Sequence, residues 1–291
     1  MLQRARHLDG RPRTPLRLLE SRERRPMMTS LVEVSNMYFH YPRAKIAAGD
    51  VGWTLHDISV AIRPNSTVGI VGESGSGKST LIRVMCGLLR HQKGSVKFDG
   101  REVSEYEGAG VNDLRRRNQI VFQNPRRSLD PRMTIRRSLS EPIRALQERN
   151  PDDTELITSI QRVGLGPEVL SRFPHQLSGG QLQRVGIARS LSVNPDVLYA
   201  DEPVSALDVS VQAQVLNLLM DLRDQLGLTL VMVSHDLGVV SRMCEEIVVM
   251  RHGRIVEAGR TDSVLAKPAS EYTAALLRAA RAASLERSTA N

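Results

Sequence analysis

A glycine-rich segment at residues 72–80 has the composition of a phosphate-binding loop. It reads Gly-Glu-Ser-Gly-Ser-Gly-Lys-Ser-Thr and fits the pattern G-x-x-x-x-G-K-[ST]. Glycines lack a Cβ, so successive backbone N–H groups can point inward at an anion, and a helix that begins near Lys78 adds its positive end. We expect Lys78 to bridge the β- and γ-phosphates of a nucleotide and the Ser79 hydroxyl to contact Mg²⁺. The residues predicted to line the nucleotide are Gly72, Glu73, Ser74, Gly75, Ser76, Gly77, Lys78, Ser79 and Thr80.

Two apolar runs predict the strands that position this chemistry. Val68-Gly69-Ile70-Val71 stands directly before the loop, and Val197-Leu198-Tyr199-Ala200 stands directly before Asp201 and Glu202. A parallel strand buried on both faces is typically a continuous apolar run, and α/β proteins bind ligands at the carboxyl ends of such strands. We therefore expect Asp201 to hold Mg²⁺ through water and Glu202 to orient or deprotonate an attacking water.

Further motifs elsewhere in the chain match one family. They are Gln123, Leu177-Ser178-Gly179-Gly180-Gln181, Ser205-Ala206-Leu207-Asp208, His235 and Tyr41. Together with the glycine-rich loop and the Asp-Glu pair, they resemble the motifs of the ATP-binding subunit of an ABC transporter, over about Leu31 to Tyr272. The resemblance implies an ATPase with an α/β fold: a P-loop NTPase core of the ABC ATPase type, an N-terminal antiparallel β subdomain and an inserted α-helical subdomain.

The resemblance also implies a role for each matched residue. Glu202, His235 and Gln123 would be catalytic, and Tyr41 would stack on adenine, although the neighbouring Tyr38 and Phe39 are alternatives. The amide of Gln123 can reach a metal-bound water, and the imidazole of His235 can contact the γ-phosphate. The implied ligands are ATP and Mg²⁺, and the residues expected around the metal are Ser79, Gln123 and Asp201.

The segment at residues 177–181 is a second phosphate-seeking surface. It precedes a predicted helix over residues 181–191, whose N-terminal backbone donors favour an anion. One chain thus has two such surfaces and one complete nucleotide pocket. The resemblance implies a head-to-tail dimer in which each ATP lies between residues 72–80 of one chain and residues 177–181 of the other, with the D-loop at residues 205–208 nearby.

The remaining patterns divide the chain into parts. Residues 1–28 are predicted to be a basic, disordered extension, residues 29–265 the ATPase domain with its helical subdomain at about 124–190, and residues 266–291 a helical tail. Strands are expected at 55–62, 95–98 and 254–259. Helices are expected at 211–226 and from 274 to about 285, and helical spacing continues from Ile135 through Ile160.

Composition excludes several other classes. No apolar run in the 291 residues approaches the roughly 18 to 20 needed to span a bilayer, so a transmembrane path would belong to other chains. The two cysteines, Cys86 just after the glycine-rich loop and Cys244 in a predicted helix, provide no disulfide framework and no zinc spacing. Of the net charge of +8, residues 1–28 contribute eight arginines and three acids, a net of +5. Weak attraction of this leader to anionic lipid or nucleic acid is an alternative to plain disorder.

Two stretches indicate one branch of the family. Residues 124–134 and 201–214 resemble the ATPases of oligopeptide, dipeptide and nickel uptake systems, and Pro268 to Thr273 partly matches the branch's Pro-His-Pro-Tyr-Thr segment, with Glu271 before the tyrosine. Many members of the branch continue into a cysteine-rich tail that holds an iron–sulfur cluster. This chain ends at Asn291 without those cysteines, so we expect no cluster.

The branch implies an energy-coupling subunit of an importer for peptides or similar small solutes. Its implied partners are two transmembrane permease subunits, a second ATPase subunit, related or identical, and indirectly a solute-binding protein, with no nucleic acid. The implied location is peripheral, on the cytoplasmic face of the inner membrane. A soluble ABC ATPase of DNA repair or translation is the alternative, although 100 positions between Lys78 and Ser178 leave no room for a long coiled coil. A regulator without turnover is disfavoured by Glu202 and His235.

Overall fold

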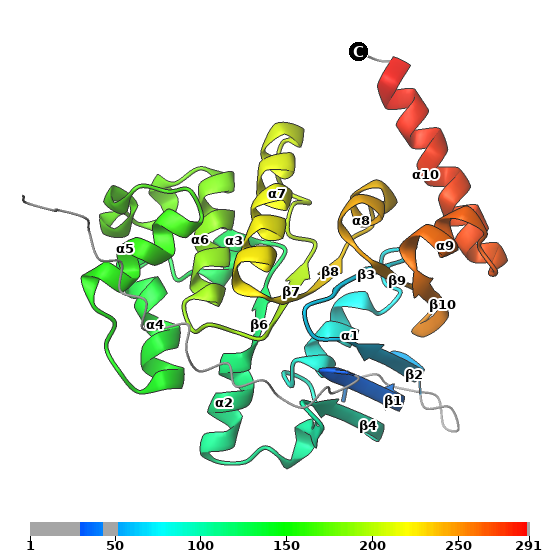
Figure 1. The fold of residues 1–291 in the computed structure, drawn as a ribbon, viewed down its shortest axis with the longest axis horizontal. Helices are drawn as coiled ribbons and strands as arrows, with labels where there is room; N and C mark the ends of the chain where they lie inside the picture. The colour runs from blue at the N-terminus through cyan, green and yellow to red at the C-terminus, as the bar shows by residue number, and fades with distance from the viewer. Residues whose placement is uncertain (1–29, 43–51, 290–291) are drawn as a thin grey trace, which may run out of the picture.

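The computed structural model describes residues 30–42 and 52–289, so the expected basic extension at 1–28 lies outside the described residues (Figure 1). The strands are β1 (Val32–Phe39), β2 (Leu55–Ile62), β3 (Thr67–Val71), β4 (Lys93–Phe98), β5 (Arg101–Glu102), β6 (Asn118–Val121), β7 (Val197–Asp201), β8 (Thr229–Val233), β9 (Glu246–Arg251) and β10 (Arg254–Arg260). The α-helices are α1 (Lys78–Met85), α2 (Ala109–Arg117), α3 (Pro125–Ser128), α4 (Ile135–Gln147), α5 (Asp153–Arg162), α6 (Gly179–Leu191), α7 (Val209–Leu226), α8 (Leu237–Met243), α9 (Thr261–Ala266) and α10 (Glu271–Thr289). Short 3-10 helices are η1 (Val103–Glu105), η2 (Pro167–Ser171) and η3 (Pro174–Gln176).

The larger sheet has the strand order β10-β9-β3-β8-β7-β6. Its neighbouring strands from β9 to β6 are parallel, and β10 pairs with β9 in the antiparallel sense. Every residue of β3, β7 and β8 is buried. The continuous apolar runs are therefore explained by burial on both faces, as parallel strands require.

The smaller sheet is antiparallel, in the order β2-β1-β4-β5. Along β1, the buried side chains change from even to odd positions between Val34 and Met37. The register shifts at the same place, where Asn36 has a φ of 45°. An irregularity of this kind moves the following side chains to the opposite face, so Met37 and Phe39 stay in the core.

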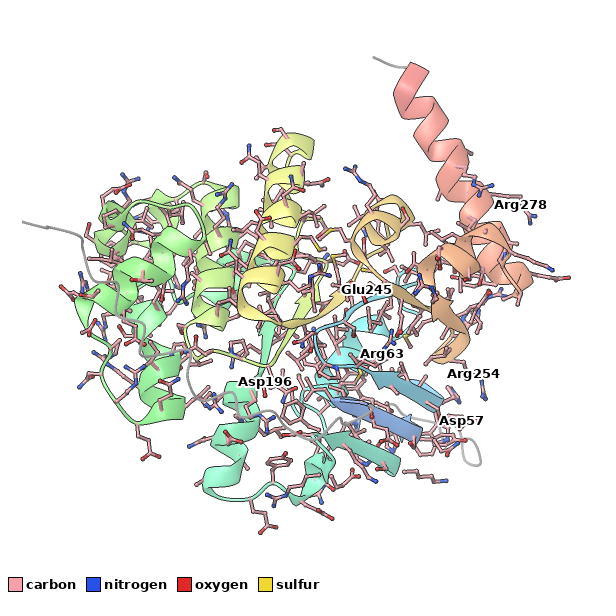
Figure 2. The ribbon with its side chains drawn as sticks, viewed as in Figure 1. Asp57, Arg63, Asp196, Glu245, Arg254 and Arg278 are labelled. Atoms are coloured by element: carbon pink, nitrogen blue, oxygen red, sulfur yellow. The ribbon has the colours of Figure 1, made fainter. Side chains whose placement is uncertain are left out.

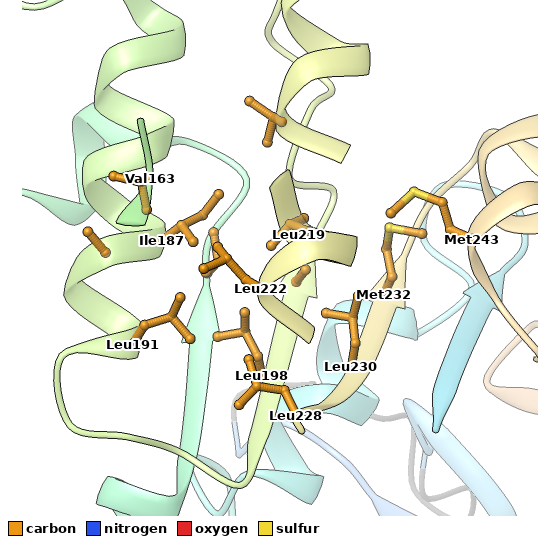
Figure 3. Close-up of a cluster of buried hydrophobic side chains, with 14 of the residues drawn as sticks. Val163, Ile187, Leu191, Leu198, Leu219, Leu222, Leu228, Leu230, Met232 and Met243 are labelled. Atoms are coloured by element: carbon orange, nitrogen blue, oxygen red, sulfur yellow. The ribbon is translucent and has the colours of Figure 1, made fainter. Parts of the chain in front are cut away.

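Alternate residues of the parallel strands supply the two sides of the core. Val197 and Tyr199 of β7 belong to the cluster shared with the small sheet and α1. Leu198, together with Leu230 and Met232 of β8, belongs to the other cluster. Figure 3 shows this second cluster, in which side chains of α6 and α7 pack against those of the sheet. The period of two in a strand thus attaches the helical part and the small sheet to opposite faces of the same strands.

The structure refines one expectation about helices and corrects two. The pattern from Ile135 to Ile160 is two helices, because the chain leaves α4 before Pro151 and α5 begins after Asp152, whose carboxylate accepts the Glu155 backbone N–H. The C-terminal helix α10 begins at Glu271 rather than Ala274, continues to Thr289, and projects from the body (Figure 1). Cys244 follows α8 instead of lying within it. None of the helices in the described ranges is long and apolar enough to cross a membrane.

A buried arginine joins the two sheets at the amino ends of β6 and β7. The Arg117 guanidinium donates to Asp99 Oδ2 at 2.6 Å and to Asp196 Oδ2 at 2.7 Å. It also lies 4.5 Å from the centre of the Phe98 ring. Figure 2 labels Asp196 near α2. One cation thus holds the end of β4, the start of β6 and the turn before β7 together.

We predict that Arg117→Ala lowers the free energy of unfolding by about 3 kcal/mol, because two partly buried carboxylates lose their cation. Arg116→Ala is the matched control, since its pair with Asp113 at 2.9 Å is exposed; it should change the free energy of unfolding by less than about 0.5 kcal/mol. Urea denaturation measures both values. Equal destabilisation by the two variants would show that the buried cation is not a joint between the sheets.

Candidate active site

The predicted site residues lie along one edge of the large sheet. Strands β3, β8, β7 and β6 are neighbours and run parallel, so their carboxyl ends meet at that edge. The glycine-rich loop follows β3, and His235 follows β8. Asp201 ends β7, and Gln123 comes two residues after β6. Segments far apart in sequence are thereby brought within side-chain reach.

The turn out of β3 requires glycine at position 72. Gly72 has a φ of 148°, and a Cβ there would lie 2.1 Å from the Met250 carbonyl oxygen and 2.9 Å from Ser76 Oγ. Gly77, with a φ of 102°, is the N-cap of α1, which begins at Lys78. The predicted strand, loop and helix context of the phosphate motif is therefore present in the structure.

The Lys78 ammonium is buried within the loop itself. Its Nζ donates to the carbonyl oxygens of Gly72 at 2.8 Å and Glu73 at 2.7 Å. Burial lowers the pKa of Lys78, while the nearby acids Glu202, Asp201 and Glu73 act in the opposite direction. A phosphate group would favour the charged form of this amine.

Ser79 and Asp201 form a hard-oxygen pair. Ser79 Oγ donates to Asp201 Oδ1 at 2.8 Å, and the carboxylate is 4% exposed. Burial raises the pKa of Asp201, whereas the Ser79 hydrogen bond and the charge of Arg83 act to lower it. The Arg83 guanidinium lies 4.0 Å from the carboxylate. A hydroxyl and a carboxylate fit Mg²⁺, which prefers oxygen ligands.

The Glu202 carboxylate is the centre of a second cluster. Gln123 Nε2 donates to Glu202 Oε2 at 3.0 Å and to Ser205 Oγ at 3.2 Å, and His235 Nδ1 lies 3.4 Å from the same Glu202 oxygen. Glu202 has a φ of 46°, an uncommon backbone conformation for a residue with a side chain. The geometry unites the three predicted catalytic residues, and it pairs the amide nitrogen of Gln123 with Glu202.

Tyr41 is the aromatic that reaches the phosphate loop. Its hydroxyl lies 3.3 Å from Thr80 Oγ1, and its ring is partly exposed. Of the two alternatives, Phe39 is buried in the core, and Tyr38 packs against Trp53 with ring centres 5.3 Å apart. Tyr41 is thus the one of the three whose surroundings fit the adenine-stacking prediction.

The segment at 177–181 lies beside the D-loop. Ser178 Oγ accepts the Gln181 backbone N–H at 3.3 Å and caps α6. A Cβ on Gly179 would lie 3.5 Å from Leu207, and one on Gly180 only 2.6 Å from Val211. Across residues 30–42 and 52–289, no hydrogen bond or ion pair joins residues 177–181 to residues 72–80. Within one chain, the two phosphate-seeking surfaces remain separate.

Sequence reasoning missed side chains that hold the motifs from outside. The Gln212 side-chain amide donates to the carbonyl oxygens of Val204 at 3.1 Å and Leu207 at 3.0 Å, and so fixes the D-loop. Arg83 faces Asp201 from α1, and Tyr272 contacts Glu73. Gln212 and Tyr272 lie in the stretches that resemble the uptake branch, and this resemblance was the sequence signal that could have found them. No sequence signal pointed to Arg83. In the part of the chain that the structure describes, no cluster of three or more His, Cys, Asp or Glu side chains could hold a metal ion.

Comparisons with known proteins agree with this geometry. Residues 55–205 match the family described as ABC transporter. The chain is 42% identical over 258 residues to the dipeptide transport ATP-binding protein DppF of Haemophilus influenzae, covering 86% of this chain and 78% of DppF. It is 41% identical over 254 residues to the glutathione import ATP-binding protein GsiA of Pectobacterium atrosepticum, covering 86% of this chain but 41% of GsiA.

A solved structure gives the same picture. The ATP-binding cassette MJ0796, solved as a dimer in a post-hydrolysis state bound to ADP and Pi, superposes with a TM-score of 0.70. The two sequences are 27% identical, and the match covers 79% of this chain and 98% of that one. The expected α/β fold of the ABC ATPase type is confirmed. The chain therefore belongs to the ABC transporter family, as one of its ATP-hydrolysing, ATP-binding cassettes.

Proposed function

We propose that the chain is the energy-coupling subunit of an importer for peptides or similar small solutes. The observation that carries the proposal is the placement of the Glu202 carboxylate, with the Gln123 amide at 3.0 Å and the His235 imidazole at 3.4 Å, one residue after Asp201. A carboxylate held beside a phosphate loop by an amide and an imidazole suits the activation of a water for phosphoryl transfer.

Residues 72–80 would hold the triphosphate of ATP, and Tyr41 would contact the base. Ser79 and Asp201, which already lie 2.8 Å apart, would hold Mg²⁺ together with Gln123. Bound Mg²⁺ would neutralise charge that develops on the phosphate oxygens. Lys78 would bring its ammonium from the loop carbonyls to the phosphates, a short rearrangement because the side chain is already enclosed by the loop.

Catalysis by this chain's own residues would be mostly a matter of position. Glu202 would orient and deprotonate the attacking water, and its unusual backbone conformation aims the carboxylate toward Gln123 and His235. His235 would contact the γ-phosphate through its exposed imidazole. Gln123 would couple nucleotide binding to movement of the helical part of the molecule, because it lies between β6 and α3.

A second ATPase chain, related or identical, would complete each site. Among the described residues, no hydrogen bond or ion pair joins residues 177–181 to the phosphate loop of their own chain; Gly179 instead lies against Leu207 of the D-loop, and Gly180 against Val211 of α7. The dimeric state in the description of MJ0796 supports a head-to-tail pair with ATP between the loop of one chain and residues 177–181 of the other. Closure of this pair would switch hydrolysis on.

A groove beside Gln123 is the proposed binding site for the permease. It has a volume of about 320 Å³ and is bounded by β6, α4 and α6, with the exposed side chains of Leu88 and Phe122 at its edge. Gln183 lies in the groove wall with its side chain buried, and its Nε2 has no hydrogen-bond partner among the described residues. An apolar edge and an unmatched donor suit a short helix of a permease subunit. Each of the two ATPase chains would receive such a helix from one of the two permeases.

The names of the relatives support the proposed solute. The names of DppF and GsiA refer to a dipeptide and to glutathione, so a peptide or similar small solute is the proposed cargo. The solute would meet a separate binding protein and the permeases rather than this chain. The proposed location is peripheral, at the cytoplasmic face of the inner membrane.

We predict that Glu202→Gln keeps ATP binding but lowers ATP turnover by about 10²- to 10⁴-fold, because the amide cannot accept the proton of the water. Binding is measured with a fluorescent ATP analogue and turnover by phosphate release. Closed dimers should accumulate with Mg·ATP in size-exclusion chromatography. Glu107→Gln, an exposed acid before α2, is the control and should hydrolyse normally. Normal hydrolysis by Glu202→Gln would contradict the assigned role.

The importer itself is tested by what the tagged Glu202→Gln chain retains from detergent-solubilised native membranes in Mg·ATP. We expect two permeases and a second ATPase by mass spectrometry. Adding Ala145→Trp, which fills the groove, should remove the permeases and leave ATP binding intact, whereas Ala282→Trp, on the exposed side of α10, should not. Recovery of soluble or nucleic-acid-bound partners alone would instead support an ABC ATPase of DNA repair or translation.

A further inference from the structure

The C-terminal segment at residues 268–273 reaches back to the phosphate loop. The backbone N–H of Glu73 donates to the Tyr272 hydroxyl at 3.2 Å, across 199 positions of sequence. The carbonyl oxygen of Glu73 accepts the Lys78 ammonium at 2.7 Å, and that of Gly72 accepts it at 2.8 Å. The same short stretch of loop backbone is therefore held by Tyr272 on one side and itself holds Lys78 on the other.

Tyr272 is fixed by its own surroundings. The Arg251 guanidinium, at the end of β9, lies 4.8 Å from the centre of the Tyr272 ring. The Glu257 carboxylate accepts the backbone N–H groups of Ala269 at 2.8 Å and Ser270 at 3.1 Å, and so anchors the start of α10 to β10. The first turns of α10 also pack on the core through Leu277. The hydroxyl is thus presented to the loop by a rigid support.

The Glu73 backbone is held from two directions: its carbonyl oxygen accepts hydrogen bonds from Lys78 and Ser76 within the loop, and its N–H donates to Tyr272 outside the loop. Gly72 has the backbone freedom of glycine, and its turn is permitted only because no Cβ is present. The Tyr272 hydroxyl accepts the backbone N–H of Glu73, the next residue, and so limits this freedom before ATP binds. Less conformational entropy is then lost when ATP binds. The position of the Lys78 ammonium then depends on a residue outside every nucleotide motif.

We propose that Tyr272 is a positioning residue for nucleotide binding: its hydroxyl holds the backbone of Gly72 and Glu73, and through it Lys78, so that ATP affinity depends on the segment at residues 268–273. The proposal rests on the assignment of residues 72–80 as the ATP loop. It gives the branch-like C-terminal segment a function that the transport proposal leaves unassigned.

Tyr272→Phe tests the proposal, because it removes one oxygen and keeps the ring over Arg251. Loss of one such hydrogen bond should weaken binding of a fluorescent ATP analogue about 3- to 10-fold. The KM for ATP should rise by the same factor, with kcat changed less than about twofold and the melting temperature lowered by no more than about 4 °C. Hydrogen exchange at the Glu73 amide of the ATP-free protein should be faster than in the wild type.

Tyr106→Phe is the matched control. The Tyr106 hydroxyl also bonds to a backbone group, here as the donor to the Phe98 carbonyl oxygen at 3.2 Å, and Arg101 lies 4.5 Å from its ring centre, but Tyr106 is remote from the loop. It should leave ATP affinity and KM unchanged. A Tyr272→Phe protein with wild-type ATP affinity, or one in which only the melting temperature falls, would overturn the positioning role.

Lys78→Ala separates failure of the proposal from failure of its premise. Loss of ATP binding in Lys78→Ala together with wild-type binding in Tyr272→Phe would overturn only the role of Tyr272. Wild-type ATP binding in Lys78→Ala would overturn the loop assignment, and with it both proposals. Weakened binding in both variants, with the larger loss in Lys78→Ala, is the result we expect.

Discussion

The candidate active site depends on the register of four neighbouring parallel strands, β3, β8, β7 and β6. Asp201 is opposite Val233, and the next residue, Glu202, donates its backbone N–H to the Val233 carbonyl oxygen at 3.1 Å. Neighbouring strands lie about 4.8 Å apart, so side chains that follow adjacent strands can touch. A slip of one residue in β7 would exchange the faces of Leu198 and Tyr199, which belong to different core clusters. The cost of misplacing these large side chains is what keeps Asp201 and Glu202 in place.

Burial at this edge leaves the site suited to charged ligands. The same desolvation lowers the pKa of Lys78 and raises the pKa of Asp201, so it opposes the charge on both groups. A phosphate would favour the ammonium, and Mg²⁺ would favour the carboxylate. Each ligand therefore relieves a penalty that the fold has created, and the two together would relieve both. The hydrogen bonds that these groups make to loop carbonyls and to Ser79 keep them satisfied in the protein alone.

The sequence predicted the parts of the structure that are local or strongly patterned. The strand at 55–62 and the loop at 72–80 have the predicted positions because apolar runs and glycine spacing act over a few residues. The helical spacing from Ile135 to Ile160 did not locate the boundary between α4 and α5, because the hydrophobic periodicity continues across the Asn150-Pro151-Asp152 break. The Arg117 joint and the contact of Tyr272 with Glu73 could not be predicted, since they join residues 18 to 199 positions apart; the branch resemblance marked the segment that contains Tyr272 but not its partner.

The missed contacts share a physical role, because each holds a motif from outside. Glu202 and Gly72 lie in backbone conformations that few residues adopt, and such segments persist only when their surroundings restrain them. Gln212 restrains the D-loop and Tyr272 the phosphate loop, each through hydrogen bonds worth about 1 kcal/mol. Contacts of this size can change without unfolding the domain or altering the reacting groups. Nucleotide affinity and the timing of closure can therefore differ between proteins with identical motifs, through side chains that never touch the nucleotide.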